Sequence, residues 1–139
     1  MVDATSIHGN DVRDILTKKP ELLAKLSGVN IKKDTLKNEH WIDVQPGRQK
    51  IDFYCEDNEG KHYVIKVAFK EKPLNAVRHP NIWQKRVAEI YEIDPDNVFG
   101  ILLIDEETVT SNPRNQKDID AFPNIKTVLY KIDDIIKEI

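Results

Sequence analysis

An unbroken apolar run, VFGILLI at residues 98–104, constrains the fold of this chain more than any other feature. Such a run is typical of a strand in a parallel sheet, because that strand is covered on both faces. Two strand-like runs at residues 51–55 and 63–68 precede it, and the turn-forming sequence DNEG at 57–60 joins them into a hairpin. Apolar spacing predicts a helix over residues 80–93, between the hairpin and the apolar run. A hairpin followed by a helical crossover to a buried parallel strand predicts an α/β fold with a central mixed sheet flanked by helices.

Local signals predict the remaining elements. Pro20 suits the first turn of a helix and Gly28 suits the end of one, whereas Pro46 and Gly47 mark a turn. We expect, in chain order, a helix over residues 11–17 with Asn10 as its N-cap, a short helix over 20–28, an irregular segment over 29–38, a strand over 41–44, a polar loop over 105–122, a strand over 125–130 and a terminal amphipathic helix over 133–139.

Length and composition indicate one globular domain spanning residues 1–139, because 139 residues can bury a core without crosslinks. The 40% hydrophobic and 32% charged residues are ordinary for that class. No apolar run approaches the roughly 18–20 residues of a membrane span, and the N-terminus lacks a signal-peptide pattern. The single cysteine, Cys55, excludes an intrachain disulfide and is expected to be a buried small hydrophobe. We therefore expect a cytoplasmic protein with no membrane partner.

The charge of the chain is unevenly distributed, although its net charge is only −3. Residues 48–86 are rich in lysine and arginine, whereas residues 87–120 are rich in acids. A basic face on an acidic protein can follow the phosphates of DNA, but an ordinary solvated surface explains the pattern equally well. Trp41 and Trp83 fit core or edge packing better than base stacking. The best candidates for phosphate contacts are Arg48, Lys72, Arg78, Lys85 and Arg86.

Five short segments stand in an order and spacing that resemble a known group of nucleases. They are ILTKKPELL at residues 15–23, GR at 47–48 with ID at 51–52, GKHYVIKVA at 60–68, WQKR at 83–86 and FGIL at 99–102. Together they resemble the restriction-endonuclease-like, PD-(D/E)xK superfamily, and within it the catalytic domain of NucS-type endonucleases. There the corresponding segments read NPELL, GRID, VVVELK, a helix with a glutamine, and RGIL. The resemblance covers most of the chain, from Asp11 to Tyr130, and implies a nuclease fold.

Residue by residue, the resemblance carries over only part of the catalytic site. Asp52 matches the metal-binding aspartate, Gln84 matches the helix glutamine, and Asp11 matches more loosely an acid that some members place on the first helix. Lys66 stands where the family has a glutamate, and Ala68 stands where it has a lysine. If the site is active, the resemblance implies Mg²⁺ or Mn²⁺ as the cofactor, with Asp52 and Asp11 as ligands.

The exchange at position 66 changes the expected chemistry. In the family, two carboxylates and a backbone carbonyl hold the metal, which lowers the pKa of the attacking water. Lys66 instead brings a cation to Asp52, and an ion pair at about 4 Å and an effective dielectric of about 20 is worth roughly 4 kcal/mol before desolvation. Such a pair would compete with a weakly held Mg²⁺. Lys70, two residues beyond Ala68 and expected on the same strand face, is the candidate substitute for the missing lysine.

These observations leave three functional hypotheses open, of which we rank the first slightly ahead. The first is a nucleic-acid-binding relative of the nucleases with a degraded metal site, in which Asp52 and Lys66 form a structural pair and the basic face contacts DNA. The second is an active Mg²⁺- or Mn²⁺-dependent DNA endonuclease with a rearranged site of Asp52, Asp11, Gln84 and Lys70. The third is a protein-interaction module, either a homodimer or a subunit that works with an active partner.

Overall fold

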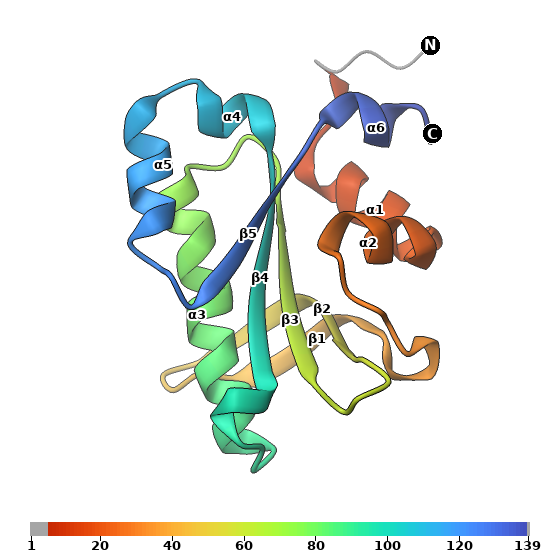
Figure 1. Ribbon diagram of the computed structural model, residues 1–139, viewed down its shortest axis with the longest axis vertical. Helices are drawn as coiled ribbons and strands as arrows, with labels where there is room; N and C mark the ends of the chain where they lie inside the picture. Colours follow the sequence, from red (N-terminus) through yellow and green to blue (C-terminus); the bar gives the residue numbers. More distant parts are fainter. Residues whose placement is uncertain (1–5, 139) are drawn as a thin grey trace.

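The computed structural model describes residues 6–138 and contains one five-stranded mixed sheet in the order β1-β2-β3-β4-β5 (Figure 1). The strands β1 (Lys37–Asp43), β2 (Arg48–Glu56) and β3 (His62–Ala68) pair antiparallel. The strands β4 (Val98–Asp105) and β5 (Ile125–Tyr130) extend the sheet in parallel with β3. The predicted mixed α/β sheet is therefore confirmed.

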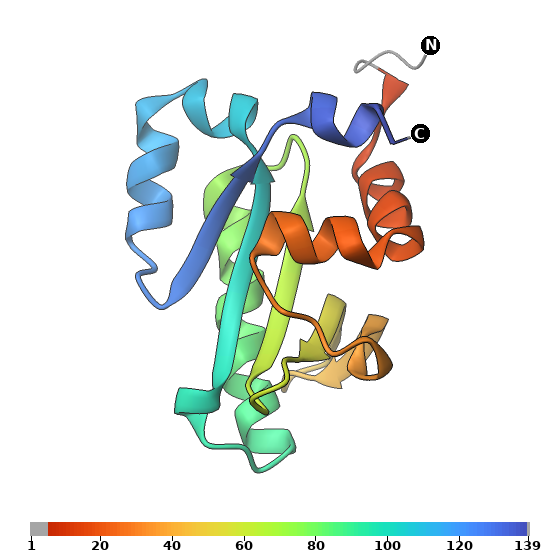
Figure 2. The ribbon, with the colours of Figure 1, turned by 45° about the vertical axis from the view of Figure 1, so that its right-hand side comes forward.

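Helices cover both faces of the parallel half of the sheet. Figure 2 shows α1 (Gly9–Lys18) and α2 (Pro20–Ser27) on one side of β3 and β4, and α3 (Pro73–Ile90) on the other. On the α3 side lie also α4 (Glu106–Thr110) and α5 (Pro113–Asp120), and α6 (Ile132–Ile136) follows β5. Two 3₁₀ turns, η2 (Lys33–Thr35) and η3 (Pro95–Asn97), precede β1 and β4. Among the residues that the structure describes, none of the helices combines the length and the apolar character that crossing a bilayer requires.

The apolar run at 98–104 is the centre of the core. Every residue of β4 except Phe99 is buried, as expected for a strand covered on both faces. Leu103 packs with Val67 against the α1–α2 side, and Leu102 packs against the α3 side. Cys55 is buried as predicted, and burial raises the pKa of its thiol to about 12.

Several predicted boundaries are wrong, each for a local reason. The segment 105–122 is not a loop, because Asp105 accepts a hydrogen bond from the Thr108 amide and Asn112 one from the Arg114 amide, which caps α4 and α5. The helix α3 begins at Pro73, its first residue, and continues through Pro80.

Smaller differences concern the ends of other elements. The first helix begins at Gly9, with His8 in place of Asn10 as the N-cap. The strand β1 begins at Lys37, inside the segment predicted to be irregular. The last helix runs from Ile132 to Ile136, and the predicted end at Ile139 lies outside the described residues.

The feature that positions the candidate site is a parting of two strands. Pairing between β2 and β3 begins only at Phe53 and Ile65, whereas pairing between β1 and β2 continues to Asp43 and Arg48. Residues 40–51, which we call the hairpin arm, therefore project beyond β3 and are paired only with each other. In Figure 1 the β1–β2 hairpin crosses behind β3 and β4.

Gly100 in β4 allows α3 to approach the sheet closely. A Cβ at this position would lie 2.5 Å from Ile125 Cδ1 and 3.2 Å from the backbone oxygen of Pro80. We expect Gly100→Ala to lower the free energy of unfolding by about 1–3 kcal/mol, because the backbone of α3 cannot yield as a side chain can. Urea denaturation measures this value. Gly9→Ala at the first residue of α1 is the control, since its Cβ meets only the Arg13 side chain at 3.4 Å or more; equal effects of the two variants would contradict the close approach.

Candidate functional site

Asp52 lies where the pairing of β2 is interrupted on both sides. Along β1 the pairs run from Asn38–Phe53 to His40–Ile51 and skip Glu39, whose φ is 52°. On the other side β2 and β3 have already parted. The Asp52 side chain bridges this gap, because its Oδ2 accepts a hydrogen bond of 2.8 Å from the backbone N–H of Val67. A side chain thus continues the contact between β2 and β3 after their backbones have separated.

The Asp52 carboxyl is 8% exposed and lies in a cationic environment. Burial raises its pKa, and the charge of Lys66, the Val67 amide and the charge of Arg13 oppose that rise. Burial prevails, so the pKa of Asp52 lies above its ordinary value.

Lys66 does not form the expected ion pair with Asp52. Its Nζ lies 3.1 Å from Oε1 of Glu71, which lies in the short connection between β3 and α3. Lys66 still acts on Asp52 through its charge, and it also lowers the pKa of His79, together with the burial of that ring. Glu71 is therefore a member of the site that the sequence reasoning missed.

Arg13 is a second missed member, and it reaches the site from α1. Its Nη1 donates a hydrogen bond of 3.4 Å to the backbone oxygen of Val67, and its Nη2 donates to Oδ1 of Asn10. The Asn10 contact, three residues back on the same helix, orients the guanidinium. Residues Asn10 and Arg13 stand at helical spacing in the sequence, but nothing there indicates that the arginine turns toward β3.

The donor set around Asp52 does not fit Mg²⁺ or Mn²⁺, which prefer several carboxylate and carbonyl oxygens. Oδ2 of Asp52 accepts the Val67 amide, and the Val67 oxygen accepts the Arg13 guanidinium. Across residues 6–138 no group of three or more carboxylate, histidine or cysteine side chains converges as metal ligands do. Two nearby side chains, those of Arg13 and Lys66, carry positive charge and would repel a divalent ion.

The structure does not bring Asp11 to Asp52. Its Oδ2 accepts a hydrogen bond of 2.8 Å from the backbone N–H of His8, so Asp11 caps the start of α1. The acid of α1 that faces the site is Asp14. It lines a cavity of about 390 Å³ between α1 and the hairpin, which we call the α1 pocket, together with Arg13, Glu39, Lys50 and Asp52.

Gln84 is likewise engaged elsewhere. Its Nε2 donates a hydrogen bond of 2.8 Å to the oxygen of Val98 at the start of β4, and its Oε1 accepts one from Asn124. Lys66 faces Leu102 on β4, four residues further along that strand. The glutamine therefore joins α3 to the far end of β4.

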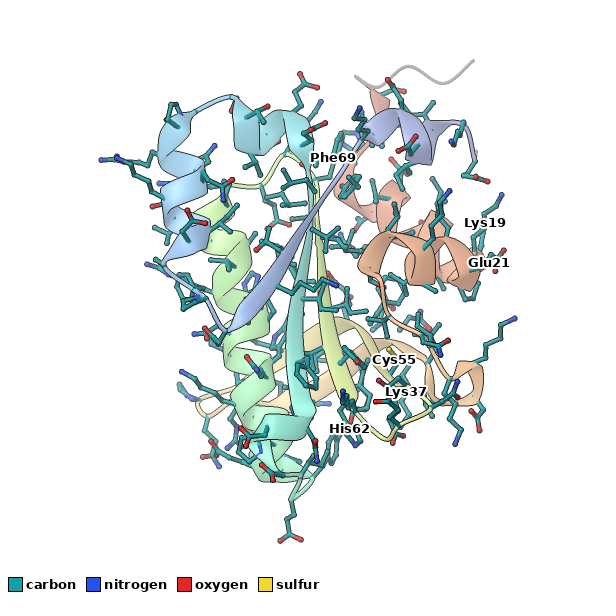
Figure 3. The ribbon with its side chains drawn as sticks, viewed as in Figure 1. Lys19, Glu21, Lys37, Cys55, His62 and Phe69 are labelled. Carbon is teal, nitrogen blue, oxygen red and sulfur yellow. The ribbon has the colours of Figure 1, made fainter. Side chains whose placement is uncertain are left out.

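Lys70 lies beyond the end of β3, so the alternation of strand faces no longer places its side chain. Its φ is 58°, and its backbone N–H donates a hydrogen bond to Oδ1 of Asp105. Its Nζ lies 5.1 Å from the centre of the Phe69 ring. In Figure 3 Phe69 and His62 mark the two ends of β3, with Phe69 at the end where the site lies. Ala68 itself is fully buried beside Ala76 and Val77.

The predicted phosphate-contact residues fall into two groups. Arg86 is held in place, because its Nε donates to the oxygen of Asp43 and its Nη1 pairs with Glu89 at 2.6 Å. The other four have no ion pair within residues 6–138. Three are exposed on or beside α3, namely Lys72, Arg78 and Lys85. Arg48 lies on the hairpin arm, with its Cζ 5.3 Å from the centre of the Trp41 ring.

Comparisons with known proteins identify the fold. No family model matches the chain, and no curated protein matches its sequence. A repair endonuclease from Pyrococcus abyssi superposes with a TM-score of 0.54 and 15% identity, covering 94% of this chain and 50% of that one. An EndoMS–dsDNA complex superposes with a TM-score of 0.48 and 16% identity, covering 94% of this chain and 49% of that one. The chain thus spans about half the length of either protein.

The first of these likenesses confirms the predicted fold. The chain has the restriction-endonuclease-like α/β fold, a five-stranded mixed sheet flanked by helices. This fold is shared with about half of the repair endonuclease from Pyrococcus abyssi.

The Asp52–Val67 hydrogen bond can be tested by stability. Both Asp52→Ala and Asp52→Asn remove the buried charge, but only the asparagine keeps an oxygen that can accept the Val67 N–H. We expect the alanine variant to be less stable than the asparagine variant by about 1–3 kcal/mol, the cost of an unsatisfied buried donor. Urea denaturation at pH 7 gives the difference. Asp14→Ala, on the exposed side of the same pocket, should behave like the unmodified protein, and equal stability of the two Asp52 variants would exclude a structural role for the carboxyl.

Proposed function

We propose that this chain is a DNA-binding domain on a nuclease fold, one that binds DNA without metal-dependent cleavage. The observation that supports this proposal is the pair of cations beside Asp52. Arg13 donates to the Val67 oxygen, and Lys66 stands beside the carboxyl where the family has a glutamate.

The two cations supply charge but no hydrolytic chemistry. Phosphodiester hydrolysis of this kind needs a metal that lowers the pKa of a bound water and neutralises the phosphate. To enter, such an ion would have to displace Arg13 from the Val67 oxygen and overcome repulsion by Lys66. A guanidinium and an ammonium can still attract phosphate oxygens, which is the sequence-independent part of DNA binding.

The surface around the site suits a polyanion. Arg48, Lys72, Arg78 and Lys85 have no internal acidic partner among the described residues, so their charges are available to phosphates. The structural neighbour from Pyrococcus abyssi is a repair endonuclease, and the shared fold supports DNA as the ligand class. We take residues 1–139 as one domain of this kind.

The direct test uses labelled single-stranded, duplex and branched DNA. We expect retention that needs no metal and falls steeply with salt, because phosphate contacts release counterions. We also expect no cleavage with Mg²⁺ or Mn²⁺. The control for binding is the Arg78→Ala/Lys85→Ala double variant, in which the slope of log affinity against log salt should become shallower by roughly 0.7–0.9 for each phosphate that the variant no longer neutralises.

Two results would overturn the proposal. Metal-dependent cleavage that disappears in Asp52→Ala would establish an active nuclease with a rearranged site, for which Glu71, whose charge acts on Asp52, is a candidate additional carboxylate. Neither cleavage nor retention, together with a size that rises with protein concentration, would establish an interaction module that acts as a homodimer or with an active partner subunit.

The displacement of the metal by protein cations has its own test. We expect thermal unfolding of the unmodified chain to be insensitive to Mg²⁺ and Mn²⁺ at constant ionic strength. The double variant Arg13→Ala/Lys66→Glu frees the Val67 oxygen and adds a carboxylate beside Asp52 and Glu71. It should therefore gain a metal-dependent rise in Tm, since an ion that binds only the folded state stabilises it. A comparable rise in the unmodified chain would show that its cations do not exclude a metal.

A further inference from the structure

A second cavity, of about 360 Å³, lies in the notch where the hairpin arm parts from β3. We call it the tryptophan pocket. Its walls come from three elements: the hairpin arm, β3 and α3. Lys50 lines both this cavity and the α1 pocket, so the two cavities adjoin across the arm.

The outer wall of the tryptophan pocket is an exposed aromatic ring with cations against it. Trp41 is 52% exposed and lies on β1, an edge strand of the sheet. Arg48 Cζ lies 5.3 Å and Lys50 Nζ 5.9 Å from the centre of its ring. The prediction that Trp41 serves packing is therefore only partly met, since about half of the surface of this residue is exposed.

The inner wall is rigid and polar. Trp83 is 3% exposed, and its indole N–H donates a hydrogen bond of 2.8 Å to Oε1 of Gln49. The His79 ring stacks on Trp83 with centroids 5.8 Å apart and an angle of 13° between the planes. Nδ1 of His79 is buried and has no hydrogen-bond partner. The inner wall of the cavity therefore includes the stacked rings of His79 and Trp83.

The charge of the lining restricts the class of ligand. Three cationic side chains line the tryptophan pocket, Arg48, Lys50 and Lys66, and the described lining includes no carboxylate. Glu39 and Glu71, which pair with Lys50 and Lys66, lie outside the lining. A pocket of this charge suits a phosphate, and an exposed indole beside it suits the face of a nucleobase. Only an unpaired base presents such a face, because bases inside a duplex are stacked on each other.

We propose that the tryptophan pocket binds one unpaired nucleotide of single-stranded DNA, with the base stacked on Trp41 and the phosphate held by Arg48, Lys50 and Lys66. This inference rests on the proposed function and specifies its ligand, since it predicts a preference for single-stranded or frayed DNA over fully paired DNA. The volume of the cavity lies within the range of small-molecule sites.

The first measurement is binding of fluorescein-labelled oligothymidine and of a fully paired duplex of two strands with the same total number of phosphates. We expect Trp41→Ala to weaken oligothymidine binding by about 5- to 150-fold, the loss that corresponds to one base–aromatic stack. Binding of the duplex should change by no more than about twofold, because phosphate contacts dominate it. Trp41→Phe keeps an aromatic face and should restore most of the affinity.

A matched control comes from the other end of β3 and β4. Phe99 is also exposed and also has a cation over its ring, since Lys61 Nζ lies 5.9 Å from its centre, but no comparable lining of cations surrounds it. Phe99→Ala should leave oligothymidine binding unchanged. An equal loss in Phe99→Ala and Trp41→Ala would overturn the assignment of the site.

Intrinsic fluorescence reports the stacking itself. The chain has two tryptophans, of which Trp83 is buried, so oligothymidine should quench the emission of Trp41. In Trp41→Phe the quenching should disappear while affinity persists. If oligothymidine and the duplex both bind but Trp41→Ala affects neither, the nucleotide site is excluded and the proposed DNA-binding function stands. If the unmodified protein binds no DNA of any kind, both are excluded.

Discussion

The hydrogen bond between the Val67 amide and the Asp52 carboxyl extends the contact between β2 and β3 past the last pair of their backbones, Phe53 and Ile65. The part of β2 that precedes Phe53 turns away from β3 together with β1. The strand β3 continues beside β4 and β5. An aspartate can bridge such a parting because its side chain reaches an amide that the neighbouring backbone no longer reaches. The same parting creates the notch beneath the hairpin arm and leaves the Val67 oxygen open to Arg13. Both cavities and the cationic environment of Asp52 therefore depend on one break in the strand pairing.

The α/β fold could be predicted because its strongest constraints are local in sequence. The apolar run at 98–104 and the hairpin at 51–68 determine the strands, and the crossover between them determines the parallel order. The helices α4 and α5 were missed because they are short and carry little apolar surface, so only the caps Asp105 and Asn112 mark them. The start of α3 was misplaced because the helix was predicted over residues 80–93, whereas Pro73 is its first residue and Pro80 lies inside it.

The candidate site was less accessible to sequence reasoning, since its members meet only in the folded protein. Asp52 and Lys66 were found through their motif positions, but their partners Arg13 and Glu71 lie 39 positions before Asp52 and five positions after Lys66, in segments without a motif. Lys70 was placed by strand alternation, which ceases to apply where β3 ends. Glu71 lies in the short connection from β3 to α3, just after the bend at residues 69–70, where no repeating pattern predicts that its side chain meets Lys66.

The positive charge that Arg13 brings to the site differs from that of a bound metal ion, because a metal ion occupies its site only as far as its concentration in solution allows. A dissociable ion is shared among all its ligands in solution, so the charge it contributes rises and falls with supply and with chelators. Arg13 is attached to α1 by a covalent chain, so its guanidinium does not dissociate from the protein. The positive charge beside Asp52 is therefore part of the polypeptide and does not depend on the concentration of an ion in solution. A protein built in this way presents the same electrostatic surface to a phosphate whether divalent ions are abundant or absent.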